Sequence, residues 1–108
     1  MKNELSENDV KVIEATNKLN KYVCAYPTRG VNISNALNSA GCKKMNTVFE
    51  LAVKATTEKD MVKLRAAVKS LVVYINQYGT RVFAVAEALK PTGSILLTNL
   101  EVLVSIEE

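Results

Sequence analysis

The sequence predicts an all-α protein, an antiparallel four-helix bundle with one long third helix. Two observations predict this class. Apolar residues recur every three or four positions along most of the chain, which is the spacing of one helix face, and no stretch alternates as a strand would. The four glycines and two prolines lie mostly between these periodic stretches, where they end helices and form turns. We expect a single domain that covers residues 1–108.

The longest apolar pattern predicts the third helix. Its members are three or four residues apart, so they share one side of a helix. The pattern passes through Gly79 without a change of phase, which predicts a continuous or gently bent helix over about 58–90. The members of the pattern are Met61, Leu64, Val68, Leu71, Ile75, Tyr78, Val82, Val85 and Leu89.

Capping residues place the start of two helices. Ser6, followed by acidic residues, predicts the start of a first helix over about 6–26, and Pro27 ends that helix. Thr57 and Asp60 have the spacing of a capping box, in which each side chain hydrogen-bonds the backbone of the other residue. The third helix is therefore expected to begin at this pair.

The second and fourth helices are less regular. The second helical segment is expected to begin at Asn32 or Ser34 and to break or bend at Gly41. The last helix is expected to begin at Ser94, directly after a turn formed by residues 90–93. No internal repeat is evident along the chain.

Composition and chain pattern indicate where the protein resides. The N-terminal residues are polar and acidic, unlike a signal peptide, and the longest apolar stretch is too short to span a bilayer. We therefore expect a cytoplasmic protein with no membrane contact. Cys24 and Cys42 have apolar neighbours, which predicts buried free thiols in a reducing compartment.

The residue types argue against catalysis. The chain has no histidine, which removes the commonest general base and the commonest zinc ligand. Its two aspartates, Asp9 and Asp60, lie at predicted helix starts, where capping explains them. We expect a protein that is not an enzyme and that has no cofactor and no metal site.

Basic side chains lie along the predicted third helix, on or beside the side opposite the apolar pattern. Two interpretations are open: these side chains solvate the helix, or they bind phosphate groups of nucleic acid. The net charge of +3 permits the second interpretation without requiring it. The candidate nucleic-acid-binding residues are Lys59, Lys63, Arg65, Lys69 and Arg81.

The predicted helix lengths suggest self-association. A third helix of about 33 residues extends for about 50 Å, whereas the last helix reaches only about 20 Å. The C-terminal part of the long apolar pattern would then be exposed in a monomer, as a patch that soluble monomers rarely tolerate. We expect a homo-oligomer, and the candidate interface residues are Tyr74, Tyr78, Val82, Phe83, Val85 and Leu89.

The order of these features resembles a known family. The first helix ends at Tyr26-Pro27-Thr28-Arg29-Gly30-Val31, and a leucine-patterned stretch from Leu64 leads into Arg81 before a short last helix. This order is similar to the four-helix-bundle family that includes the accessory variability proteins of diversity-generating retroelements and the proteins encoded by ribosomal-RNA intervening sequences. The resemblance implies a cytoplasmic homo-oligomeric ring, often a pentamer, that binds a reverse transcriptase and nucleic acid through basic residues.

Two functional hypotheses follow from these features. The first is a non-catalytic, self-associating helical bundle that acts as an accessory factor and binds nucleic acid, a partner polymerase such as a reverse transcriptase, or both. The alternative is a small helical adaptor or inhibitor, possibly from a mobile element, that binds another protein through its surplus of apolar surface.

Overall fold

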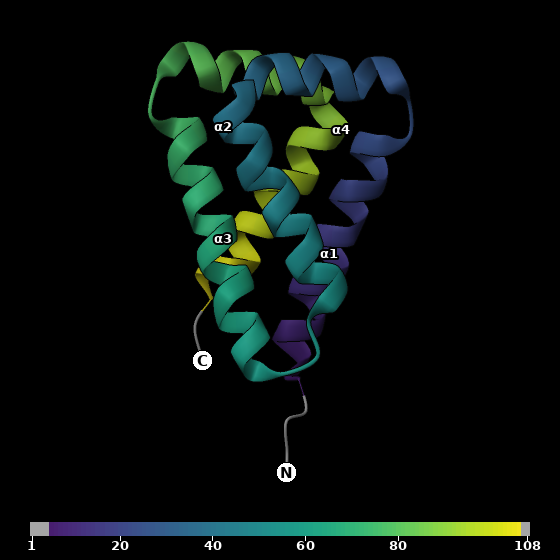
Figure 1. Cartoon of the computed structure of the whole chain (residues 1–108), viewed down its shortest axis with the longest axis vertical. Helices are drawn as coiled ribbons and strands as arrows, with labels where there is room; N and C mark the ends of the chain where they lie inside the picture. The colour runs from purple at the N-terminus through teal and green to yellow at the C-terminus, as the bar shows by residue number, and fades with distance from the viewer. Residues whose placement is uncertain (1–4, 107–108) are drawn as a thin grey trace.

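The computed structural model describes residues 5–106, which form four helices (Figure 1). No strand occurs in this described part of the chain, so the all-α prediction is confirmed. The helices are α1 (Glu7–Cys24), α2 (Pro27–Lys54), α3 (Glu58–Asn76) and α4 (Gly79–Ser105).

The helices α2 and α4 each contain a sharp bend. Asn38 in α2 has φ 65° and ψ 179°, and Lys90 in α4 has φ 66° and ψ 172°. The bend in α2 was predicted at Gly41, but Gly41 is helical and buried within the second segment of that helix. The bends divide α2 into segments 27–37 and 39–54, and α4 into segments 79–89 and 91–105.

Four long segments run along the molecule and two short segments cross its far end (Figure 1). In the figure α1 rises from the N-terminus, the second segment of α2 descends, α3 rises and the second segment of α4 descends to the C-terminus. The short segments 27–37 and 79–89 cross above them, at the end opposite the termini. The chain is therefore turned at that end by helices, where loops were expected.

The prediction of one long third helix is wrong. The helix α3 ends at Asn76, and Tyr78 has the extended conformation, with φ −133° and ψ 135°, before α4 begins at Gly79. Ile75 and Val85 are nevertheless both buried in the same core. The pattern members at the break, Tyr78 and Val82, are exposed, and burial resumes at Val85. The unbroken spacing of apolar residues in the sequence therefore did not require one straight helix.

The chain consists of two similar halves, an internal repeat that inspection of the sequence missed. The bends at Asn38 and Lys90 lie 52 positions apart, and the same shift superimposes Tyr22 on Tyr74. The residues that are identical at this shift are Lys2/Lys54, Val10/Val62, Lys11/Lys63, Ala15/Ala67, Leu19/Leu71, Tyr22/Tyr74, Tyr26/Tyr78, Thr28/Thr80, Arg29/Arg81, Ala36/Ala88, Leu37/Leu89, Gly41/Gly93 and Leu51/Leu103.

Reciprocal hydrogen bonds join the two halves. The hydroxyl of Tyr22 donates to the carbonyl oxygen of Leu89 at 2.6 Å, and the hydroxyl of Tyr74 donates to the carbonyl oxygen of Leu37 at 2.7 Å. Each of these carbonyls directly precedes a bend, where the helical hydrogen-bond ladder is interrupted. Because each half supplies the donor for the other, the halves are related by a pseudo-two-fold axis.

The same tyrosine rings explain why glycine occupies positions 41 and 93. A Cβ atom added to Gly41 would lie 2.6 Å from Cε2 of Tyr74, and one added to Gly93 would lie 2.6 Å from Cε2 of Tyr22. Both glycines therefore allow the tyrosine ring of the other half to reach the bend.

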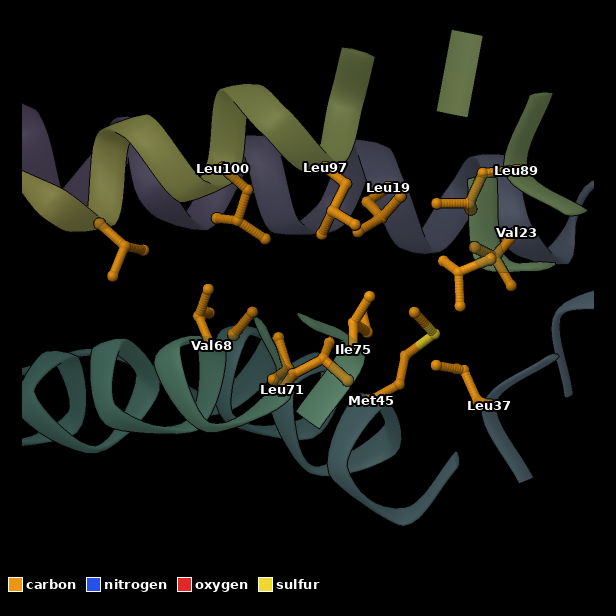
Figure 2. Close-up of a cluster of buried hydrophobic side chains, with 14 of the residues drawn as sticks. Leu19, Val23, Leu37, Met45, Val68, Leu71, Ile75, Leu89, Leu97 and Leu100 are labelled. Carbon is orange, nitrogen blue, oxygen red and sulfur yellow. The ribbon is translucent and has the colours of Figure 1, made fainter. Parts of the chain in front are cut away.

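The core lies between α1 and α4 on one side and α2 and α3 on the other (Figure 2). Leu97 and Leu100 of α4 and Leu19 of α1 point towards Val68, Leu71 and Ile75 of α3 and Met45 of α2. Leu19 and Leu71 are equivalent in the repeat, as are Met45 and Leu97. The core thus has the same pseudo-two-fold symmetry as the backbone.

Both predicted helix starts are confirmed. Ser6 and Asp9 form a capping box at α1, and Thr57 and Asp60 form one at α3. The backbone hydrogen bonds that Asp60 accepts from Thr56 and Thr57 hold the pKa of its carboxyl below the ordinary value.

Candidate functional site

The candidate nucleic-acid-binding residues divide into two groups. Lys59, Lys63 and Lys69 are exposed on α3, as predicted from the sequence. Arg65 and Arg81 are only partly exposed, and both guanidinium groups make hydrogen bonds within the chain. The two arginines therefore belong to the framework of the fold.

Arg65 connects the two ends of the chain. Its Nη2 lies 2.8 Å from Oδ1 of Asp9, and its Nη1 donates to the carbonyls of Leu103, Val104 and Ile106 at the end of α4. Burial of Asp9 disfavours its charged form, but the hydrogen bonds from Arg65 and Ser6 outweigh burial and hold the pKa of Asp9 below the ordinary value.

Arg81 stabilises the turn between α3 and α4. Its Nη1 donates to the carbonyl of Tyr74 at 2.6 Å, and its guanidinium carbon lies 3.7 Å from the centre of the Tyr74 ring. Arg29 makes the same contacts in the other half, with a hydrogen bond of 2.7 Å to the carbonyl of Tyr22 and a distance of 3.8 Å to its ring. The pattern Tyr-x-x-x-Tyr-x-Thr-Arg, present at 22–29 and 74–81, is the sequence signal that could have identified the repeat.

The exposed lysines of α3 lie beside two lysines of α2. Lys43, Lys44 and Thr47 of α2 line a hollow of about 260 Å³ together with Ala67 and Ser70 of α3. Lys63 lies one helical turn before Ala67, on the same side of α3. The name α2–α3 basic face is used for the lysines that surround these positions, which are Lys43, Lys44, Lys59, Lys63 and Lys69.

A second hollow continues this face along α3. It has a volume of about 590 Å³, and Lys44, Lys69 and Ser70 are among its lining residues. The ammonium group of Lys44 donates to Oγ of Ser70 at 2.9 Å, which joins the two helices here. Sequence reasoning had not assigned Lys43 and Lys44 to a site, although they are the longest basic run in the chain.

Lys43, Lys59 and Lys63 form no ion pair with any residue in the described range 5–106. Glu50 is the acidic residue of α2 that lies two helical turns from Lys43. The face therefore presents like charges from two helices to solvent, with hydroxyl groups between them.

The candidate interface residues do not form one exposed surface. Val85 and Leu89 are buried in the chain's own core, and Tyr74 is half-buried against the bend in α2. Only Tyr78, Val82 and Phe83 are exposed, with Phe83 65% exposed. The sequence argument required an unpartnered helix, whereas the turn at Tyr78 folds segment 79–89 back across the molecule.

The two cysteines line a groove of about 580 Å³ between α1 and α2. Cys42 is half-buried, and Cys24 is exposed, so the prediction that both thiols are buried is wrong. Cys24 follows the buried Val23 at the end of α1, and its thiol donates to Oδ1 of Asn20 on the exposed side of the helix. Within residues 5–106 no group of three or more histidine, cysteine or carboxylate side chains could hold a metal ion.

One carboxylate lies in an apolar environment. Glu101 of α4 lines a hollow of about 350 Å³ with Val68, Val72 and Val73 of α3, and burial raises the pKa of Glu101. The equivalent residue in the first half is Phe49, which packs against the core. Lys69 also lines this hollow.

Comparisons with known proteins found no matching family model, no matching curated protein and no matching solved structure. None of the described helices has the length and apolar character needed to cross a membrane.

Proposed function

We propose that this protein is a non-catalytic helical module that binds nucleic acid through the α2–α3 basic face, as an accessory factor to a nucleic-acid-processing enzyme such as a polymerase. The observation that carries the proposal is the convergence of lysines from two helices around two adjoining hollows. Lysine ammonium groups bind phosphate oxygens and displace condensed counterions, which gives sequence-independent affinity.

The internal repeat allows Lys43 and Lys44 to be compared with the equivalent residues of the second half. The positions equivalent to Lys43 and Lys44 are Ile95 and Leu96, on the opposite side of the molecule. The framework therefore tolerates apolar residues at these positions. The fold does not require lysine at these positions, and phosphate binding accounts for basic residues that gather on one side alone.

The two aspartates support the non-catalytic part of the proposal. Asp9 is engaged by Arg65 and by the α1 capping box, and Asp60 is engaged by the backbone of Thr56 and Thr57. Both aspartates accept hydrogen bonds that hold them as charged acceptors, which is unsuited to proton transfer near neutral pH.

The experiment measures binding of fluorescently labelled duplex DNA and structured RNA over a range of salt concentrations. Binding should weaken as salt rises, with a linear dependence of log K on log salt. The double variant Lys43→Gln/Lys63→Gln should reduce affinity about tenfold and lower the salt slope by about two. A matched control is Lys21→Gln/Lys90→Gln, which removes the same charge from exposed positions away from the basic face.

Two outcomes would contradict the proposal. One is the absence of salt-sensitive binding at micromolar protein. The other is an equal loss of affinity in the matched control, because net charge and not the α2–α3 basic face would then determine binding.

A second candidate function, that of a protein-binding adaptor, rests on the crossed segments. Tyr26, Val31, Tyr78, Val82 and Phe83 are exposed where segments 27–37 and 79–89 begin. Aromatic residues of this kind often anchor protein interfaces. A pull-down that enriches one protein, survives nuclease treatment and is lost with Phe83→Asp would favour the adaptor over nucleic-acid binding.

A further inference from the structure

The side of the molecule opposite the basic face carries an apolar stripe on α4. Ile95, Val102 and Ile106 are 60%, 54% and 47% exposed, and they follow one another at spacings of seven and four residues. Asn99 is exposed between them, and Leu96 and Leu103 are half-buried along the inner edge. The stripe is formed by Ile95, Leu96, Asn99, Val102, Leu103 and Ile106, none of which is charged.

The stripe is specific to the second half of the chain. The residues of α2 equivalent to Ile95, Val102 and Ile106 are Lys43, Glu50 and Lys54. The same backbone therefore carries charged residues on one side and apolar residues on the other. Exposed apolar residues gathered in one place on a soluble protein indicate an interaction surface.

A row of alternating charges on α1 runs beside the stripe. Glu7, Lys11, Glu14 and Lys18 are all exposed, and they are spaced three or four residues apart along one side of the helix. The amide of Asn8 donates to the carbonyl of Leu103 at 3.5 Å, which places residue 8 level with residue 103.

The row and the stripe share a centre. In Figure 1 α1 and the second segment of α4 run in opposite directions, and helices rise by about 1.5 Å per residue. Because the helices are antiparallel, residue numbers rise along α1 while they fall along α4. The midpoint between Lys11 and Glu14, four to five residues after Asn8, is therefore level with Asn99, four residues before Leu103. The surface made of the stripe and this row is called the α1–α4 face.

We propose that the α1–α4 face binds a second copy of the same chain in a two-fold symmetric dimer. The two-fold axis passes at the level of Asn99, so that α4 lies antiparallel to α4 and α1 lies antiparallel to α1. Asn99 then meets Asn99 of the second copy, and Ile95 meets Leu103 of the second copy. A two-fold interface requires a self-complementary surface, and an uncharged stripe centred on an amide that can donate to and accept from its own copy meets that requirement.

The charge row is self-complementary under the same operation. Reversing the order negative, positive, negative, positive exchanges the signs, so Lys11 faces Glu14 of the second copy and Glu7 faces Lys18. The other two-fold arrangement, with parallel helices, would place the charges of α1 on the apolar stripe of α4 and desolvate them without partners. Charge complementarity therefore selects the antiparallel arrangement.

The face extends along two neighbouring helices, over residues 7–18 of α1 and residues 95–106 at the C-terminal end of α4. A standard interface buries about 800 Å² on each partner. Because the basic face lies on the opposite side, a dimer would carry its two basic faces on its two outer sides, pointing away from each other.

The test is the oligomeric state of the full chain, measured by size exclusion with light scattering from low to high micromolar protein. The expected mass at the upper end is twice 11.8 kDa. Ile95→Lys and Val102→Glu should each shift the protein to monomer. Both substitutions install the residue that α2 carries at the equivalent position, so the backbone is known to accept it there. Val73→Lys is the matched control, because Val73 is exposed on α3 and its equivalent is Lys21.

A charge exchange tests the orientation. Glu14→Lys places two lysines opposite each other at both symmetric contacts, and the dimer dissociation constant should rise about tenfold. The double exchange Lys11→Glu/Glu14→Lys restores opposite signs and should return the constant to within about threefold of the original. Circular dichroism should show every variant to be folded.

Three results would overturn the proposal. An unmodified protein that remains monomeric at all concentrations would leave the α1–α4 face to a different protein partner. A dimer that persists in both Ile95→Lys and Val102→Glu would place the interface elsewhere. A double exchange no better than Glu14→Lys would exclude the antiparallel arrangement. None of these outcomes depends on whether the α2–α3 basic face binds nucleic acid.

Discussion

The two halves of this protein have nearly the same backbone and different surfaces. Each half contains a capped helix, a turn at a tyrosine in the extended conformation, a short segment, a bend at positive φ and a second long segment. The sides of the two halves nevertheless differ, because Lys43, Glu50 and Lys54 of α2 correspond to Ile95, Val102 and Ile106 of α4.

The comparison shows which residues the fold requires. The positions that agree between the halves include two buried leucine pairs and the tyrosine, arginine and glycine around each bend, and most buried pairs that differ exchange one apolar residue for another. The positions that disagree are mainly exposed. A framework held by a few residues leaves the surface free to differ, and this protein presents a basic side and an apolar side on one backbone.

The largest expected effect concerns the glycines beneath the tyrosine rings. Gly41→Ala and Gly93→Ala each place a Cβ atom 2.6 Å from a ring carbon of Tyr74 or Tyr22. Each should lower the free energy of unfolding by about 2 to 3 kcal/mol, since overpacking a rigid contact forces the ring or the helix to move. Urea denaturation monitored by circular dichroism measures the change.

Gly79→Ala is the control for these variants. A Cβ atom at Gly79 would have no neighbour within 4 Å, so this change should be neutral or should stabilise the protein by up to about 1 kcal/mol. Equal destabilisation at all three glycines would show that the tyrosine contacts are not the cause.

The next effect tests a difference between the halves. Asp9 caps α1 and also pairs with Arg65, whereas Asp60, the carboxylate of the α3 capping box, hydrogen-bonds local backbone and hydroxyl groups. Asp9→Asn should lower the free energy of unfolding by about 2 kcal/mol at neutral pH, the usual scale for a hydrogen bond to a charged group. Asp60→Asn should have the smaller effect, because Asp60 lies at the exposed end of α3.

Acid titration gives the sign of the same interaction. The pKa of Asp9 is lower in the folded protein than in the unfolded chain, so its stabilising contribution is present above the ordinary aspartate pKa and is lost as pH falls through the folded value. The free energy of unfolding should therefore decline below about pH 4. Asp9→Asn should make this decline shallower, and an unchanged slope would contradict the role assigned to Asp9.

A smaller effect tests whether the halves are truly reciprocal. Tyr22→Phe and Tyr74→Phe each remove the hydroxyl that satisfies the carbonyl before a bend. Each should cost about 1 kcal/mol, because an acceptor loses its partner while the ring still packs. Thermal unfolding should show similar shifts for the two variants, and a large difference between them would break the pseudo-two-fold description.

The smallest expected effect concerns the bends. Asn38 and Lys90 adopt φ near 65° with ψ near 180°, a region that favours glycine. Lys90→Gly should stabilise the protein by about 1 kcal/mol, since relief of strain exceeds the entropy cost of glycine. Asn38→Gly should have less effect because asparagine tolerates positive φ. Lys21→Gly in α1 is the control and should destabilise by about 1 kcal/mol.

The sequence by itself determined the helical class and the starts of two helices. Apolar periodicity identified the core side of α3, where Met61, Leu64, Val68 and Leu71 are all buried. Both capping boxes could be predicted from the sequence because a capping box depends on residues only three positions apart. The exposed lysines of α3 were readable for a similar reason, since they lie opposite the apolar pattern of the same helix.

Only the tertiary structure decided where the chain turns and which residues meet. The bends at Asn38 and Lys90 depend on tyrosines from the other half, so no local pattern specifies them. Lys43 and Lys44 join the lysines of α3 because α2 packs antiparallel to α3. Arg65 and Arg81 were assigned to the surface because most of their acceptors are backbone carbonyls, which sequence patterns do not identify, and because Asp9, the ion-pair partner of Arg65, is distant in the chain. Residue types indicate local secondary structure, whereas contacts between residues distant in the chain are known only from the folded structure.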